Sequence, residues 1–271
     1  MKTDIIIPFY NQISLLSVCL KSLELSLKSN IRIILVNDGS DQRNLETIKN
    51  SNFQLNLQII NHDQNKGFRE SINTGLQVCN KKYVVLLNSD TIITPGSIEK
   101  IIGLLEKNEN IKAASPVSNA IGDIYQFRDG LKYIGNDISS LFRNISKASE
   151  SLHRNNLGLF SRVPFLTAFC IALDREFFIK IGCFSKDYIH GYFEDLDLSC
   201  RIREAGYDLV VSENAFVFHH SQGTYKHFHK IKREKILKKN FEIFSSRWRH
   251  LTEYNDLVFR LRQTSNWKLS T

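Results

Sequence analysis

The chain has 271 residues, of which 42% are hydrophobic and 24% are charged, as in a globular protein of one large or two small domains. Its net charge of +8 comes from residues 226–271, which contain 12 Lys and Arg but 4 Asp and Glu, so the remaining body is neutral. The five cysteines include no CxxC pair, and no run of about 18 apolar residues occurs, which argues against zinc-ribbon, thioredoxin-like and membrane-spanning proteins. We expect a cytoplasmic protein with reduced thiols, and the apolar stretch before Pro8 is too short for a signal peptide.

Short apolar strands alternate with amphipathic helices over the first 110 residues. The spacing of apolar residues predicts strands at 5–7, 31–36, 57–60 and 83–87, and helices at 11–27, 45–48 and 68–78. This alternation is typical of a doubly wound parallel sheet that is covered on both faces. Ligands bind such sheets beyond the carboxyl ends of the strands. Asp38 and Asp90, which follow the second and fourth strands, are therefore expected to face one crevice.

The second half of the chain has a less regular pattern. Residues 115–165 are polar and contain several glycines, which indicates loops and short helices. The later elements are predicted as a strand within 165–173, helices at 174–181 and 196–204 that end before glycines, and short strands at 209–211 and 216–218.

Three groups of acidic residues are candidates for chemistry. Asp38 can accept hydrogen bonds from a ribose hydroxyl or a base N–H, although Asp-Gly is also a common turn dipeptide. Asp90, at a strand end, suits Mg²⁺ or Mn²⁺ held together with substrate phosphates, although Asp also caps helices. Glu194, Asp195 and Asp197 open a predicted helix, where the helix dipole favours acids. Three acids within four residues exceed the need of one cap, and a positioned carboxylate can act as a general base.

A histidine pair and a glycine are further candidates. His219 and His220 follow an apolar strand, and because neighbouring strand residues point to opposite faces, only one of them should face a given site. Gly67 lies at a strand-to-helix junction, where it permits close approach of the backbone. The signatures of dinucleotide-binding folds and P-loops do not occur.

Taken in order, these segments resemble the family 2 glycosyltransferases. The resemblance spans about residues 4–225 and rests on Ile-Ile-Pro-Phe-Tyr-Asn at 6–11, Val-Asn-Asp-Gly-Ser at 36–40, Asn-Lys-Gly-Phe at 65–68, Leu-Asn-Ser-Asp at 87–90, Phe-Glu-Asp-Leu-Asp-Leu at 193–198 and Val-Phe-His at 217–219. The branch it resembles most is rhamnosyltransferase-like and builds bacterial polysaccharides of the cell envelope. The resemblance implies an α/β GT-A fold over 1–225, with a mostly parallel Rossmann-like sheet flanked by helices. Residues 1–115 would bind the nucleotide sugar, 116–225 would form the acceptor half, and 226–271 would be a basic helical extension.

The resemblance also implies roles for single residues. The donor-binding set is Pro8, Tyr10, Asp38, Gly67, Ser89 and Asp90. Asp90 ends a DxD-type motif that reads Asn-Ser-Asp in this chain, and it would hold Mn²⁺ or Mg²⁺ at the donor diphosphate together with His219, or with His220 as second choice. Asp195, with Glu194 beside it, would be the base of an inverting transfer to a hydroxyl of a glycan, lipid-linked or protein-linked acceptor.

Two alternatives remain from the sequence. A nucleotidyltransferase that makes sugar nucleotides has a related fold, but its Gly-rich, basic N-terminal loop is missing at residues 6–11. A catalytically weak or inactive nucleotide-sugar-binding protein is favoured only by Asn88, which stands where the motif usually has its first acid.

The basic tail carries one apolar stripe at helical spacing. The stripe consists of Leu237, Phe241, Phe244, Trp248 and Leu251. It predicts a helix that packs on the body or pairs with a second copy in a homodimer. The other interpretation is a helix lying on an anionic membrane near a lipid-linked acceptor. Nucleic acid is not expected as a partner, because the body is neutral and no known binding motif occurs.

Overall fold

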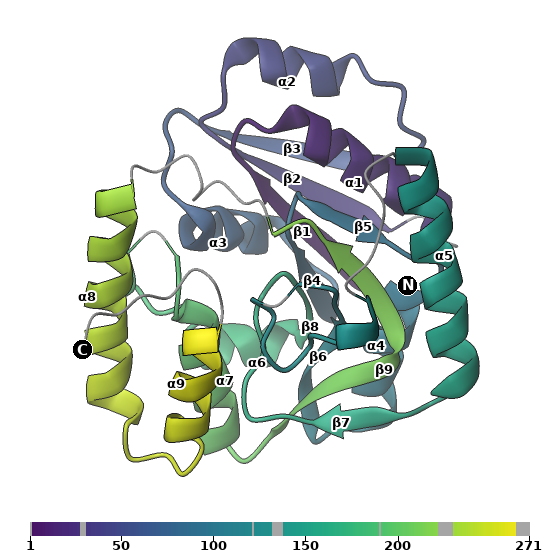
Figure 1. The fold of residues 1–271 in the computed structure, drawn as a ribbon. Coiled ribbons are helices and arrows are strands. Elements are labelled where there is room, and N and C mark those ends of the chain that lie inside the picture. Colours follow the sequence, from purple (N-terminus) through teal and green to yellow (C-terminus); the bar gives the residue numbers. More distant parts are fainter. Residues whose placement is uncertain are drawn as a thin grey trace.

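The computed structural model describes residues 2–27, 31–120, 122–131, 138–189, 191–221 and 230–263. Within these residues one nine-stranded sheet forms the centre, with strand order β3-β2-β1-β4-β8-β6-β9-β5 and β7 paired to β9 (Figure 1). The strands are β1 Thr3–Phe9, β2 Arg32–Asp38, β3 Asn56–His62, β4 Tyr83–Leu87, β5 Thr91–Ile93, β6 Ile111–Val117, β7 Phe160–Arg162, β8 Cys170–Asp174 and β9 Asp208–His219. The helices are α1 Ile13–Ser26, α2 Gln42–Lys49, α3 Phe68–Val78, α4 Ser97–Lys107, α5 Ile138–Asn155, α6 Arg175–Lys180, α7 Glu194–Glu204, α8 Lys230–Trp248 and α9 Tyr254–Gln263, with a 3-10 turn η1 at Asp129–Leu131.

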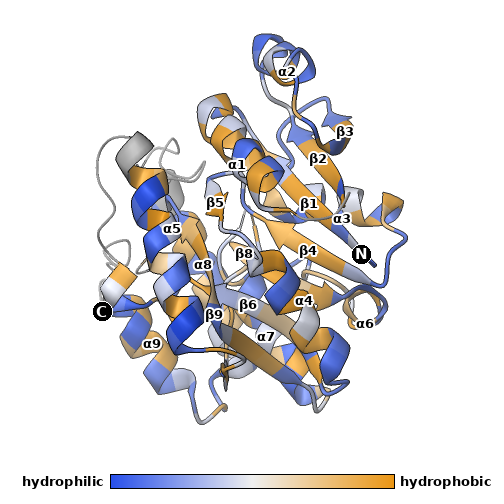
Figure 2. Cartoon of the chain, turned by 90° about the vertical axis from the view of Figure 1, so that its right-hand side faces the viewer, coloured by the Kyte–Doolittle hydropathy of each residue, from blue (hydrophilic) through white to orange (hydrophobic). Residues whose placement is uncertain are grey.

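The first four strands are parallel, as their sequence pattern predicts. Successive residues of β1 point to opposite faces, so Ile5 and Ile7 join one hydrophobic cluster and Ile6 joins another. Helices α1 and α4 cover the first face, whereas α3, α6 and α7 cover the second. Figure 2 shows the resulting pattern, with hydrophobic strands inside and helices that carry their polar residues outward. The parallel order brings the carboxyl ends of β1 to β4 to one edge of the sheet.

The second half of the sheet is mixed in direction. Strand β8 runs antiparallel to β4 and β6, and β9 is parallel to β6. The two short strands predicted at 209–211 and 216–218 form one strand, β9. The polar residues 212–214 between them remain extended, and the pairing with β6 shifts register there, between Pro116 and Val117. The predicted strand at 165–173 begins only at Cys170, and the five residues before it are a buried loop. The pattern did not indicate β5, β6, β7, α4 or α5.

The tail folds as α8 and α9 and packs beside α7 (Figure 1). Leu237, Phe244 and Trp248 of the stripe are buried in a third hydrophobic cluster with Phe165 and Phe193, and Phe241 and Leu251 lie partly buried against it. Packing on the body is therefore what the structure shows, and the stripe does not form the exposed apolar face that a membrane requires. No helix in the described ranges has the length and apolarity to cross a bilayer.

Candidate active site

Asp38, at the carboxyl end of β2, is buried against the loop that leads from β3 to α3. Its Oδ1 atom accepts a hydrogen bond from the N–H of Lys66 at 2.8 Å and lies 2.9 Å from Nδ1 of His62. Its Oδ2 atom accepts from the N–H of Gly67 at 2.8 Å. His62 also contacts Thr74 of α3 through Nε2. The structure thus brings Asp38 and Gly67 together, and the carboxylate fixes the loop that begins α3.

Two further loops meet this one at the same edge of the sheet. The N–H of Asn11, just after β1, donates to Oγ of Ser40 at 2.8 Å. Gly39 has a φ of +76°, and a Cβ atom there would lie 2.5 Å from the carbonyl carbon of Gln64, so only glycine fits between the loops. Three other residues were predicted to bind the donor. Pro8 is buried within β1, and Tyr10 is half-buried just after this strand. Ser89 is half-buried in the link between β4 and β5.

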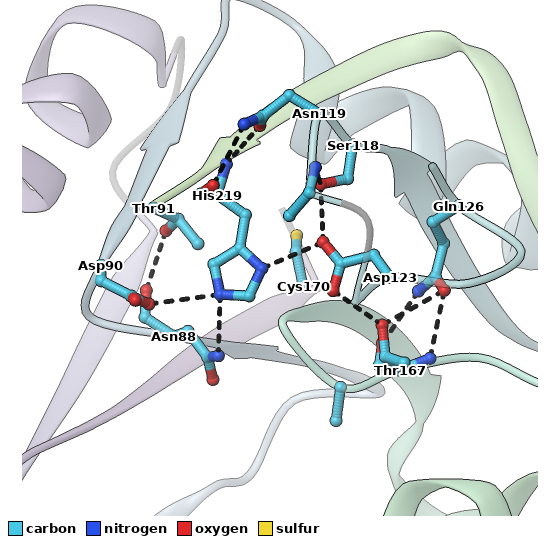
Figure 3. A network of polar contacts seen from close by, with 12 residues as sticks. Asn88, Asp90, Thr91, Ser118, Asn119, Asp123, Gln126, Thr167, Cys170 and His219 are labelled. Carbon is cyan, nitrogen blue, oxygen red and sulfur yellow. Dashed lines mark hydrogen bonds and ion pairs between the residues drawn. The ribbon is translucent and has the colours of Figure 1, made fainter. Parts of the chain in front are cut away.

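His219, the last residue of β9, lies against Asp90 (Figure 3). Its Nε2 atom is 3.4 Å from Oδ1 of Asp90 and 3.5 Å from the amide nitrogen of Asn88. The ring stacks on Phe169, with centroids 5.1 Å apart and planes inclined by 13°. Asn119 holds the backbone of His219, accepting from its N–H and donating to its C=O. The two residues predicted at the cation therefore share one place in the fold.

His220, the second choice for that place, has a different position. Its backbone N–H donates to the C=O of Asp90 at 3.0 Å, while its ring packs edge-on against Phe218. Burial lowers the pKa of this ring. The ring of His219 contacts the side chain of Asp90, which favours His219 as the partner of Asp90.

Asp123 connects His219 to the rest of the site. Its Oδ2 atom lies 2.9 Å from Nδ1 of His219 and accepts from the hydroxyl of Ser118 at 2.6 Å, while Oδ1 accepts from the hydroxyl of Thr167 at 3.1 Å. Burial lowers the pKa of His219, but the carboxylates of Asp123 and Asp90 outweigh it and raise this pKa to about 10. A divalent cation bound at Nε2 must displace that proton, because only the neutral imidazole is a ligand.

The donor atoms at Asp90 and His219 fit Mn²⁺ or Mg²⁺ held at a diphosphate. Among the residues that the structure describes, no three His, Cys, Asp or Glu side chains are arranged to hold a metal by themselves. Cations of this kind are usually bound by one or two side chains, with phosphate oxygens and water completing the shell. Asn88 adds a neutral amide near this place, where an acid would have added charge.

Glu194 and Asp195 open α7. Oδ1 of Asp195 accepts from the N–H of Leu196 at 2.9 Å, and Oδ2 accepts from the N–H of Ala168 at 3.1 Å. Burial raises the pKa of Asp195 against the effect of these two amides, and the charge of Asp123 adds to the rise. Burial, followed by the charge of Asp195, raises the pKa of Glu194 as well. A carboxylate with a raised pKa is a stronger base and is suited to remove a proton.

The third acid of this helix has a structural task. Asp197 is fully buried, and its Oδ1 atom accepts from the hydroxyl of Tyr188 at 3.1 Å and from Nε1 of Trp248 at 2.9 Å. Its Oδ2 atom accepts from Nε of Arg201 at 2.8 Å. Asp197 therefore ties α7 to α8, which explains why this short segment holds more acids than a cap requires.

The sequence alone indicates no role for Asp123, Asn119 or His62. The first two lie in the segment 115–165, whose irregular pattern predicts loops and short helices. Strand β6 was not predicted, but assigning residues 111–117 as a strand would have placed Asn119 just beyond its carboxyl end. His62 stands at the end of β3, level with Asp38 in the parallel register, and that pairing follows only once the strands are aligned.

Comparison with known proteins gives a consistent family. Residues 4–182 match the model of Glycosyl transferase family 2. An uncharacterized glycosyltransferase of Haemophilus influenzae is 29% identical over 250 residues, which cover 86% of this chain and 72% of that protein. A second one from the same organism is 26% identical over 179 residues, which cover 66% of this chain and 55% of that protein. The chain therefore spans between about half and three quarters of the length of these two relatives.

Solved structures of low sequence identity share the GT-A fold. The mannosyltransferase PcManGT from Pyrobaculum calidifontis, in complex with GDP-Man and Mn²⁺, superposes with a TM-score of 0.66 at 15% identity, covering 98% of this chain and 70% of that one. GalNAc-T7 with UDP, GalNAc and Mn²⁺ superposes with a TM-score of 0.60 at 16% identity, covering 80% of this chain and 43% of that one. At such identities the similarity establishes the fold alone.

Proposed function

This chain belongs to glycosyl transferase family 2, and we propose that it moves a sugar from a nucleotide diphosphate to an acceptor hydroxyl with inversion at the anomeric carbon. The observation that carries this proposal is an unbroken run of contacts between the cation end and the base end of the site. Asp90 meets His219, His219 meets Asp123, and Asp123 meets the hydroxyl of Thr167. The next peptide N–H along the chain binds Asp195. The residues that would act on the leaving diphosphate and the residue that would activate the acceptor hydroxyl therefore lie in one region of the fold.

Asp195 is the proposed general base. Its carboxylate would take the proton of the acceptor hydroxyl as that oxygen attacks the sugar, a contribution of roughly 10²–10⁴ in rate. The backbone amides of Ala168 and Leu196 keep the carboxylate in one orientation. Attack on the face opposite the diphosphate inverts the anomeric centre in a single displacement, so no covalent sugar–enzyme intermediate is required.

The donor end would be formed by the loops around Asp38 and by Asp90 with His219. Asp90 and His219 would hold a divalent cation there, and such a cation would supply Lewis-acid stabilisation of the leaving diphosphate. The structures of PcManGT and GalNAc-T7, whose complexes contain a nucleotide or nucleotide sugar and Mn²⁺, support this choice of donor and metal. His219 would then serve as a neutral ligand through Nε2, because Asp123 occupies its Nδ1 edge.

The acceptor and setting are further parts of the proposal. The Asn-Ser-Asp motif supports the rhamnosyltransferase-like branch, hence a glycan, lipid-linked or protein-linked acceptor in the building of cell-envelope polysaccharide. The cytoplasm is the proposed compartment. Contact with an anionic membrane would use the exposed Lys235, Lys238 and Lys239 of α8. Liposome flotation of the wild type and of a variant with these lysines changed to Gln tests this membrane contact. Equal flotation of the two proteins would reject it.

The test of function is product release from a panel of nucleotide sugars with Mn²⁺ or Mg²⁺. Release of nucleoside diphosphate, with the opposite anomer in the transferred or hydrolysed sugar by NMR, is the expected result. A nucleotidyltransferase would instead release pyrophosphate from a nucleoside triphosphate mixed with a sugar 1-phosphate, and it would leave the nucleotide sugars intact. Tight binding of nucleotide sugar with no turnover of any donor would identify the inactive binding protein that Asn88 favours. Asp195→Asn and Asp90→Asn serve as matched variants, and both should strongly reduce the release of nucleoside diphosphate.

A further inference from the structure

The segment that leads into Asp195 has a strained backbone. Gly191, Tyr192 and Phe193 have φ values of +102°, +69° and +73°, and Glu194 follows directly. Two successive bulky residues with positive φ are rare, and each such residue costs about 1–3 kcal/mol, so it persists only where surrounding contacts hold it. The direction in which α7 begins, and with it the position of Asp195, depends on those contacts.

One side chain of the tail supplies many of them. Asn240 of α8 is fully buried, and its side-chain oxygen and nitrogen both bind this segment. Its Oδ1 atom accepts from the N–H of Ile189 at 3.1 Å. Its Nδ2 atom donates to the C=O of Ile189 at 3.0 Å, of Gly191 at 2.7 Å and of Tyr192 at 3.2 Å. One buried amide thus pairs four backbone groups of a loop outside the helices and strands.

Helix α8 also contacts residues just before and just after Asp195. The ring of Phe193 packs against Phe241 and Phe244, with centroids 5.8 and 5.4 Å apart. Beyond Asp195, the indole of Trp248 donates to Asp197. The stretch matched by the family model ends at residue 182, so it includes neither α7 nor α8.

We propose that Asn240 is a positioning residue for catalysis and that α8 belongs to the catalytic unit. The amide of Asn240 holds the strained backbone before α7 in the one conformation that aims Asp195 at the acceptor hydroxyl. The inference rests on the proposed function, in which Asp195 is the base. Within the described chain, the side-chain hydrogen bonds of Asn240 go to Ile189, Gly191 and Tyr192 and not to the donor loops, so donor binding should not depend on it.

The experiment compares Asn240→Ala and Asn240→Asp with the wild type in the full-length protein. The Asp variant keeps the size and the acceptor but cannot donate to the three carbonyl groups. Three readouts are needed: kcat for transfer, the Kd of nucleoside diphosphate with Mn²⁺ by calorimetry, and hydrogen exchange of residues 191–196. We expect a loss of about 100-fold in kcat, as for a base misplaced by about 1 Å, with an unchanged Kd and faster exchange of this segment.

Asn214→Ala is the matched control. Asn214 is also a buried asparagine, but its amide accepts from Ser212 within β9, outside the segment in question. A general loss of stability would lower kcat, donor affinity and thermal stability in Asn240→Ala as it does in this control, and that parallel would overturn the proposal. Unchanged kcat in both Asn240 variants would overturn it as well. A wild type that turns over no donor would refute the proposed function, whereas the exchange comparison would still show whether Asn240 holds the segment.

Discussion

The Nδ1 edge of His219 lies 2.9 Å from Oδ2 of Asp123, while the Nε2 edge of the same ring faces Asp90. Figure 3 shows the ring between the two carboxylates. A carboxylate that binds one nitrogen of a metal-ligating histidine fixes the tautomer and the ring orientation, and so leaves the other nitrogen for the metal. Asp123 and His219 thus form a pair in which the first residue decides what the second can bind.

The first prediction concerns this pair. In Asp123→Asn the carboxamide no longer provides the charge that holds a proton on Nδ1, so Nε2 is less available as a ligand. We expect the affinity for Mn²⁺, measured by calorimetry in the presence of nucleoside diphosphate, to fall by about 10–100-fold. Ser118→Ala, which removes a neutral partner of Asp123 and an acceptor for the N–H of Ala120, should have a smaller effect on metal affinity. Wild-type affinity in Asp123→Asn would show that the pair plays no part in metal binding.

The second prediction concerns the base. Asp195→Asn keeps the size of the side chain but cannot take a proton, so kcat for transfer should fall by roughly 10²–10⁴. Donor binding should persist, because within the part of the chain that the structure describes the carboxylate of Asp195 accepts from the backbone amides of Leu196 and Ala168 and not from the donor loops. Asp208→Asn, at the opposite end of β9 from His219, is the control that should retain activity. Near wild-type turnover by Asp195→Asn would remove this residue from the proposed role.

The third prediction concerns the dependence of stability on pH. Glu194 is buried, its Oε2 atom has no hydrogen-bond partner within the described chain, and its pKa is raised. Above the ordinary value of about 4.3, the folded protein keeps a proton that the unfolded chain has released, so stability falls as the pH rises through the raised pKa. Glu194→Gln removes this loss.

Thermal unfolding at several pH values measures the effect of Glu194. The gain in Tm of Glu194→Gln over the wild type should grow from acid to alkaline pH. Glu176→Gln, at a side chain that is 86% exposed, should show no such trend. If the gain were the same at every pH, the proton on Glu194 would not be its cause.

The fourth prediction separates a buried ion pair from an exposed one. Asp197 and Arg201 form a pair one turn apart in α7, and the carboxylate is fully buried. Arg201→Ala would remove the nearer of the two cations of this carboxylate and leave Arg247, which lies 3.4 Å from Oδ1. We expect a cost of up to about 3–5 kcal/mol of unfolding free energy, the typical range when a buried ion pair is broken. In α5, Glu150 and Arg154 have the same spacing, but both are largely exposed, so Arg154→Ala should have no measurable effect. Urea unfolding of both variants compares them, and equal stabilities would show that Asp197 does not depend on its ion pair.

Much of this site can be predicted because it follows from a local rule. Asp38 ends the apolar strand β2 and Asp90 lies shortly after the apolar strand β4, and parallel strands bring such residues to one edge of the sheet. Asp195 also stands out, because acids gather in the first turn of one helix. The family resemblance then relates these acids and His219 to a common chemistry, and the structure places His219 in contact with Asp90.

The remaining parts depend on contacts between distant segments. Asp123 reaches His219 across 96 residues of sequence, from a loop without a regular pattern. Asn240 lies in a helix that the sequence marks only by its apolar stripe, and a single asparagine among lysines gives no sign that it binds the loop before α7. Strand β9 was predicted only as two shorter strands, because its polar residues interrupt the apolar pattern while the backbone stays extended. Tertiary contacts decide each of these features.

The proposed mechanism requires Asp90, His219 and Asp195 to surround one bound diphosphate sugar. Crystals grown with Mn²⁺ and a nucleoside diphosphate, measured at the manganese absorption edge, test this arrangement without any assay of turnover. We expect one strong anomalous peak within ligand distance of the Asp90 carboxylate and Nε2 of His219, with the terminal phosphate on the side that faces Asp195. Manganese bound elsewhere, with Asp195 turned to a different surface from the phosphate, would contradict the mechanism.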